Sequence, residues 1–209
     1  MKKFLPIFLL SISFLFLNGC VSIKNFEKEK NLSSGLSAVL DDGYKTALYR
    51  TTIDIGSKHF SGLFYFKTFS DTSYRIIFMS EFGLSMLDME YKNNAFKTVS
   101  CQEFMDKKVI INTLQNDLKL LIDLPKDTSK KQTYKSTNSK TTLTKIKNRS
   151  KRYYYYYTQN GEILKIIQTK CLKHVEILIP EYKNNIPQKI EIYHKRIKLS
   201  IKLRLIKLK

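Results

Sequence analysis

Hydrophobic and polar residues alternate along most of the chain after residue 45. Between Ala47 and Ile55 the odd-numbered side chains share one face of an extended strand, and mostly polar side chains share the other. The same period-two pattern returns at 60–66, 74–78, 87–91 and 95–99, with turn-forming residues such as Asn93-Asn94 between the runs. Five successive strands joined by short turns predict an antiparallel meander.

The period changes between residues 103 and 124. Apolar residues there recur every three or four positions, as on one stripe of an amphipathic helix. The stripe consists of Phe104, Ile110, Ile111, Leu114, Leu118, Leu121 and Ile122. Pro125 ends the predicted helix. The next segment, Lys126 to Asn138, has no hydrophobic periodicity and predicts a long basic loop.

Alternation resumes in the last third of the chain. Candidate strands lie at 143–146, 153–157, 163–167, 175–179, 190–192 and 197–205, with Gln159-Asn160-Gly161 as a hairpin turn. The last of them has one apolar and one cationic face. The five consecutive tyrosines at 153–157 place aromatic rings on both faces of their strand. A change of parity between Ile192 and Ile197 predicts a turn or bulge within 193–196.

The order of strands, one long helix and further strands predicts an α+β fold that is mainly antiparallel β. A sheet with this many strands does not stay flat, so we expect residues 45–209 to form one domain in which the sheet curls over the helix.

The N-terminus has the three parts of an export signal. Lys2 and Lys3 precede an apolar run from Phe4 to Leu17, which is short for a membrane-spanning helix. The run ends in Leu17-Asn18-Gly19-Cys20, which resembles the lipobox of bacterial lipoproteins, where the cysteine thiol is diacylglycerated before cleavage. We therefore expect residues 1–19 to be a lipoprotein signal peptide and Cys20 to be lipidated. The alternative is an ordinary secretory signal with an incidental cysteine.

Residues 20–44 would connect the lipid to the domain. Val21 to Lys30 is polar and predicts a flexible tether, and Leu32 to Leu40 predicts a short helix. Two acyl chains suffice for stable anchoring, since each buried methylene contributes about 0.8 kcal/mol. We expect the mature protein to be held on a membrane surface as a monomer, without spanning the bilayer.

The net charge of +19 is concentrated in two segments. Residues 126–152 hold ten basic residues and one acid, and residues 183–209 hold nine basic residues and one acid. Export excludes nucleic acid as the partner, so an anionic membrane surface is the predicted contact, through Lys130, Lys131, Lys198 and Lys202. The alternative is that these lysines only keep the surface solvated.

Residues with catalytic chemistry are scattered. His59, His174 and His194 lack metal-ligand spacing, and no nucleophile elbow, phosphate loop or dinucleotide-binding motif occurs. We expect a non-enzymatic protein with no cofactor and no metal. Cys101 and Cys171 are able to form a disulfide in an oxidising compartment or to remain as two free thiols, and the sequence leaves both open.

Several short segments in this order resemble the LolA/LolB family of lipoprotein carriers and receptors, and more narrowly the LolB-like lipoproteins of Bacteroidetes. They extend over most of residues 45–205. The segments are Phe60-Ser61-Gly62-Leu63, Tyr74-Arg75-Ile76-Ile77-Phe78, Glu81-Phe82-Gly83-Leu84 with Asp88, Asn112 to Leu121, and Ile186-Pro187 to Ile201.

This resemblance implies an unclosed antiparallel β-barrel, or half-barrel, whose apolar concave face, lidded by helices, shields acyl chains. The implied role is outer-membrane lipoprotein receipt or lipid handling, with a periplasmic carrier as a possible partner and the outer membrane, facing the periplasm, as the location. An apolar cavity with few polar contacts suffices for such a ligand. The candidate lining residues are Phe64, Phe66, Ile76, Phe78 and Met86. The alternative function is a structural or adaptor lipoprotein of an outer-membrane assembly that carries no lipid.

Overall fold

A single antiparallel sheet forms most of the protein. The computed structural model describes residues 23–29, 36–40, 45–69, 73–125, 130–171 and 173–209. Its 13 strands lie in the order β1-β7-β8-β9-β10-β11-β12-β13-β2-β3-β4-β5-β6. The strands are β1 (Phe26–Glu29), β2 (Thr46–Ile55), β3 (Lys58–Thr68), β4 (Tyr74–Met79), β5 (Ser85–Lys92), β6 (Ala95–Cys101), β7 (Lys131–Ser136), β8 (Thr141–Asn148), β9 (Lys151–Thr158), β10 (Ile163–Lys170), β11 (Lys173–Lys183), β12 (Ile186–His194) and β13 (Leu199–Leu208). The helix α2 (Lys108–Ile122) connects β6 to β7.

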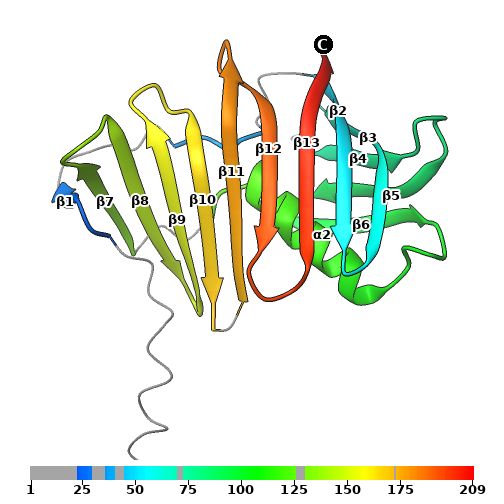
Figure 1. Ribbon diagram of the computed structural model, residues 1–209, viewed down its shortest axis with the longest axis horizontal. Coiled ribbons are helices and arrows are strands. Elements are labelled where there is room, and N and C mark those ends of the chain that lie inside the picture. The colour runs from blue at the N-terminus through cyan, green and yellow to red at the C-terminus, as the bar shows by residue number, and fades with distance from the viewer. Residues whose placement is uncertain (1–22, 30–35, 41–44, 70–72, 126–129, 172) are drawn as a thin grey trace, which may run out of the picture.

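Two meanders join at the centre of the sheet. The first runs from β2 to β6 and the second from β7 to β13. The last strand returns to pair with β2 over almost its whole length, from Leu199 opposite Ile55 to Leu208 opposite Ala47. This long-range pairing makes one continuous sheet of both halves (Figure 1).

The sheet curls, and α2 lies across its concave side (Figure 1). Alternate residues of each strand point to that side and form the main core with the helix. A smaller cluster on the opposite, convex face contains Leu143, Tyr154 and Ile167, with Phe26 and Tyr156 at its edge. Tyr155 is fully buried in the main core while Tyr154 belongs to the convex cluster, so the tyrosine run does supply rings to both faces.

The predicted fold class is confirmed at this level: a mainly antiparallel, unclosed sheet with one helix among the described residues. Each strand of the first meander is present, and the six later strands lie where the alternation predicts them. The predicted turn after Ile192 is also present, because β12 ends at His194 and β13 begins at Leu199. Ile197 lies in this turn and is 50% exposed, so the last strand begins at Leu199, two residues later than predicted.

The segment predicted as a long basic loop is in part a strand, so that prediction is wrong. Residues 131–136 form β7, paired with β8, while 126–129 lie outside the described residues. The inward positions of this strand are polar, as at Thr133, whose hydroxyl lies 3.4 Å from that of the buried Thr144. A strand that buries threonine instead of valine gives no hydrophobic period to detect.

The predicted tether is also wrong in part. Phe26–Glu29 forms β1, which pairs with β7, and the Phe26 ring packs edge-on against Tyr156 at 5.9 Å. The predicted helix at 32–40 lies partly outside the described residues, and its described part, 36–40, is not helical. There Leu40 is fully buried, and its backbone N–H donates to the Leu121 carbonyl at 2.9 Å. Both segments are ordered by contacts with distant parts of the chain.

Candidate functional site

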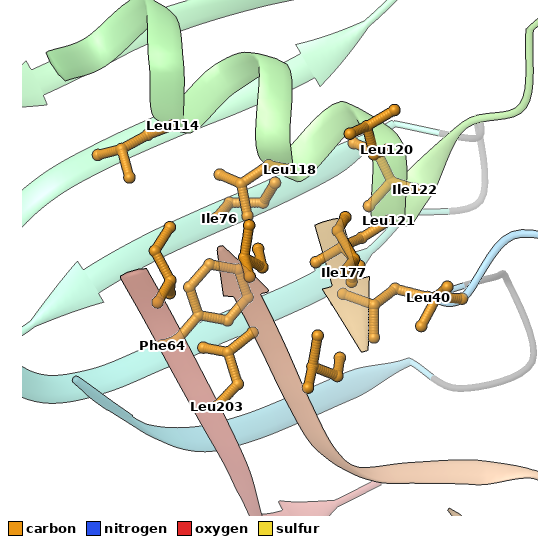
Figure 2. Close-up of a cluster of buried hydrophobic side chains, with 14 of the residues drawn as sticks. Leu40, Phe64, Ile76, Leu114, Leu118, Leu120, Leu121, Ile122, Ile177 and Leu203 are labelled. Carbon is orange, nitrogen blue, oxygen red and sulfur yellow. The ribbon is translucent and has the colours of Figure 1, made fainter. Parts of the chain in front are cut away.

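The concave face beneath α2 carries the larger of the two hydrophobic clusters of the described residues. Its floor comes from one set of neighbouring strands, in the order β12-β13-β2-β3-β4-β5. Figure 2 shows Phe64, Ile76 and Leu203 pointing from these strands toward Leu114 and Leu118 of the helix. Each of these five side chains is no more than 5% exposed, because the sheet encloses them from below and the helix from above.

The helix presents the apolar stripe that the sequence predicts. Leu114, Leu118 and Leu121 are buried against the sheet, and Ile122 closes the end of the stripe. Helix formation starts at Lys108, later than the predicted start, because residues 102–106 form a tight turn in which the Met105 N–H donates to the Gln102 carbonyl. Phe104 therefore lies outside the helix and stacks on Phe60 at 5.8 Å.

A small cavity remains between helix and sheet. Its volume is about 20 Å³, close to the space of one water molecule. All the side chains around it are apolar except that of Thr51: Ile53, Phe64, Ile76, Phe78, Leu87, Met89, Leu114, Leu118, Ile192, Ile201 and Leu203. The leucines of α2 thus occupy the concave face in this structure, and an acyl chain requires the helix to move.

Three of the five predicted lining residues meet at this cavity: Phe64, Ile76 and Phe78. Phe66 is fully buried farther along β3, where its ring stacks on Tyr74 at 5.2 Å. Met86 is buried at an irregularity of the β4–β5 pairing and directs its terminal methyl group toward Gly62. Glycine is required at 62, since a Cβ there would collide with the Met79 carbonyl oxygen.

Other lining residues were not among the predicted candidates. Leu87 and Met89 come from β5, and Ile192, Ile201 and Leu203 come from the second half of the chain. Their alternation was visible in the sequence, but the pairing of β13 with β2 that brings them beneath the same helix was not.

The concave face becomes polar toward one end of the helix. Asp117 lies on α2 only 1% exposed, and its Oδ2 is 2.8 Å from Nε2 of His194. Its other oxygen, Oδ1, is buried without a hydrogen-bond partner. Burial raises the pKa of Asp117 above its ordinary value, against the opposing effect of His194.

The four lysines predicted to contact an anionic surface lie in two separate places. Lys130 and Lys131 lie at the start of β7 and Lys198 and Lys202 lie at β13, with five strands between them, roughly 29 Å along the sheet. Lys131 pairs with Ile146 of the concave core, whereas Lys202 alternates with the buried Ile201 and Leu203 and so faces the convex side. Contact of each pair with an anionic surface stays a prediction.

An exposed apolar tip occurs at the turn between β4 and β5. Phe82 is 99% exposed and Leu84 is 62% exposed. Large apolar side chains at a protruding turn are typical of contact with a membrane or a partner protein. The pattern Glu81-Phe82-Gly83-Leu84 was visible in the sequence, but its exposure was not.

The cysteines and His59 are the remaining candidate residues. Cys20 lies outside the described residues, and Cys101 and Cys171 are free thiols. His59 lies near the end of a hairpin with its Nδ1 2.6 Å from Asp54 Oδ1, and both side chains are largely exposed. Within the described residues no cluster of three or more metal-ligating side chains occurs, and no helix there has the length and hydropathy to span a bilayer.

Comparison with known proteins gives similarity at the level of structure only. No family model matches the chain, and no curated protein matches it. A crystal structure of a DUF1329 family protein from Desulfovibrio piger has a TM-score of 0.47 and 9% identity, covering 80% of this chain and 86% of that one. A LolA superfamily protein from Nitrosomonas europaea has a TM-score of 0.44 and 6% identity, covering 79% of this chain and 85% of that one.

Proposed function

We propose that this protein is a lipid-anchored envelope protein that binds an acyl chain, of a lipid or of a lipoprotein, between α2 and the concave face of the sheet. Its role would be lipid handling or lipoprotein receipt at the outer membrane. The observation that carries the proposal is the helix itself: a single amphipathic helix covers a curled apolar sheet. Acyl chains have no directional groups, so an apolar enclosure of this kind suffices to hold them.

The helix is attached to the sheet mainly by side chains. Among the described residues, the one backbone hydrogen bond from α2 to a distant segment joins the Leu121 carbonyl to Leu40, which lies outside the sheet. Displacing α2 therefore breaks no sheet pairing. The helix can act as a lid while the strands keep their register.

The free energy needed to expose the apolar side of α2 is similar to the free energy gained by burying an acyl chain. Five apolar side chains of α2 are buried, and exposing them costs about 8 to 15 kcal/mol at the usual 1.5 to 3 kcal/mol each. An acyl chain of roughly 15 methylenes gains about 12 kcal/mol when it is buried. When an acyl chain replaces the apolar side chains of α2 on the sheet, the free energy lost and the free energy gained are thus nearly equal. This balance suits a protein that must both accept and release its ligand.

The exposed tip between β4 and β5 would bring the protein into contact with a membrane. Phe82 and Leu84 stand at the end of the β4–β5 hairpin, and the inner faces of the same two strands carry Ile76 and Met89 to the cavity. Insertion of the tip into lipid would bring the open concave face close to acyl chains.

Native mass spectrometry of the unacylated protein, prepared without residues 1–19 and with Cys20→Ser, tests the proposal. We expect co-purified lipid, and after delipidation we expect saturable binding of a fluorescent fatty acid at one site. A protein that is always empty and takes up no fatty acid would refute the proposal.

The adaptor alternative rests on the open edges of the sheet. β6 pairs with β5 on one side, and no described strand pairs with its other side. Unpaired strand edges are ready surfaces for β-strand addition by a partner. A stable partner in a pull-down experiment, with no lipid uptake, would favour this function.

A further inference from the structure

A second, larger pocket lies where strands β9 to β12 end beside α2. Its volume is about 330 Å³, within the range of small-ligand sites. Four of its residues lie at strand ends: Lys151 begins β9, Lys170 ends β10, Lys173 begins β11 and His194 ends β12. Because neighbouring strands are antiparallel, all four residues lie at the same end of the strands. Arg196, in the following turn, and Asp117, on the helix, complete this polar pocket.

The polar pocket continues the apolar concave face. On β12, Ile192 lines the apolar cavity and His194, two residues farther on the same face, lines the polar pocket. On α2, Leu114 and Leu118 line the cavity, and their neighbours Thr113 and Asp117 line the pocket. A molecule with an apolar chain and a polar head would therefore find both environments beneath one helix.

Most of the charged side chains of the pocket are cations, and in the part of the chain that the structure describes these cations form no ion pair. Among the described residues, Lys151, Lys170, Lys173 and Arg196 form no ion pair, whereas Lys165 and Lys189 on the same strands are paired with Glu176 and Glu191. Burial lowers the pKa of Lys151, and the charges of Lys170, Lys119 and Lys173 lower it further. Four cations and one buried acid, Asp117, leave the pocket with an excess of positive charge, which is complementary to an anion.

Asp117 is the acid of the pocket, and it is already engaged on one side. His194 holds its Oδ2, while Oδ1 remains buried and without a partner. A hydroxyl group of a ligand would donate to this oxygen and remove the cost of an unsatisfied buried acceptor. The pocket thus offers cations for a negative group and one acceptor for a hydroxyl.

We propose that the polar pocket binds the phosphate-bearing headgroup of an acylated glycerolipid, with phosphate on the cations and a headgroup hydroxyl on Asp117, while the acyl chain enters the concave face. This inference rests on the proposed function and specifies its ligand as a net-anionic lipid. It also gives the two basic segments of the sequence a common location: Lys151 comes from the first and Arg196 from the second.

Lysolipids with one chain and different headgroups test the inference. Lysophosphatidylglycerol and lysophosphatidylcholine of equal chain length are compared as competitors of a fluorescent fatty acid, on the unacylated protein. We expect tighter binding of the anionic lipid. The double substitution Lys170→Gln and Lys173→Gln, at exposed positions, should lower the affinity for that lipid by roughly 25-fold, since each cation near phosphate raises the affinity by roughly fivefold. It should weaken binding of the zwitterionic lipid less, because the choline cation of that headgroup offsets the charge of its phosphate.

The matched control is Lys135→Gln with Lys140→Gln. It removes the same charge at exposed positions near the opposite end of the strands and should change neither affinity. Loss of anionic-lipid binding in both double variants would reduce the effect to net charge and overturn the inference.

The remaining outcomes separate this inference from the proposed function. Equal affinity for both lipids, unchanged by the pocket substitutions, would overturn the headgroup site and leave acyl-chain binding intact. If neither lipid displaces the fatty acid, that result would count against lipid binding itself. Inorganic phosphate could also bind, with an affinity that the lysine substitutions lower and that neither lipid competes with. That result would show a site for free anions and would overturn the proposal that the ligand is a lipid headgroup.

Discussion

Replacing Leu118 with alanine should lower stability and raise ligand affinity at the same time. Leu118 is 5% exposed and lines the cavity of about 20 Å³ beneath α2. Removing its branched end leaves a larger cavity, and leucine-to-alanine changes at such sites cost about 3 kcal/mol. For a chain of this size we expect the melting temperature to fall by about 6 to 12 °C.

The effect on binding has the opposite sign if α2 is a lid. An acyl chain displaces the contacts of Leu118, so a variant that has already lost them needs less energy to open. Up to the whole destabilisation can appear as affinity, which corresponds to a gain of about tenfold to 100-fold. Fluorescent fatty acid titration measures this gain, and urea unfolding measures the stability.

Leu143→Ala is the matched control. Leu143 is fully buried too, but it belongs to the convex cluster with Tyr154 and Ile167. The same chemical change there should lower stability by a similar amount and leave fatty acid affinity unchanged. If Leu118→Ala weakens binding, or alters it no more than Leu143→Ala does, then α2 is a fixed part of the core and the lid argument is refuted.

Three other predictions follow from the sequence and the site. Cys20→Ala should abolish labelling of the protein by radioactive palmitate and leave the precursor uncleaved, whereas labelling that persists would place the lipid elsewhere. Phe82→Glu should reduce flotation of the unacylated protein with lipid vesicles without lowering its melting temperature, because Phe82 is 99% exposed; unchanged flotation would exclude the tip from membrane contact. Asp117→Asn tests the buried carboxyl: because its pKa is raised in the folded state, the folded protein binds the proton more tightly than the unfolded chain does. The stability of the native protein relative to this variant should then be greatest in acid and fall as pH rises above the ordinary value of 3.8, by at most about 1.4 kcal/mol per pH unit. Urea unfolding of both proteins at several pH values measures this difference, and a relative stability that rises with pH would show that the ion pair with His194 dominates.

The strands and the helix follow largely from local patterns in the sequence. Alternation at 47–55 and 74–78 predicts strands because successive side chains point to opposite faces. The stripe from Leu114 to Leu121 predicts a helix because residues three and four apart share a face. The hairpin at Asn93-Asn94 follows as well, since both residues have positive φ and asparagine tolerates that conformation.

Pairing between distant strands was decided only by the tertiary structure. β13 lies beside β2, and β1 lies beside β7, although many residues separate each pair along the chain. Period two shows which face of a strand is apolar and says nothing of its neighbour. Thr133 shows a second limit, because a buried threonine that has a hydroxyl partner carries no apolar signal.

The candidate sites show the same division between local and long-range information. Cys20 and the apolar residues Phe64, Ile76 and Phe78 were identified from patterns within a few residues, and the last three do meet at one cavity. Lys151 and Arg196 were each visible as part of a basic segment, but the four lysines chosen to represent those segments lie at two distant strands, with Lys131 on the concave face and Lys202 on the convex face. Composition determines how much charge a segment carries. Only strand order and register determine which of its charges meet, because a shift of one residue turns a side chain to the other face of the sheet.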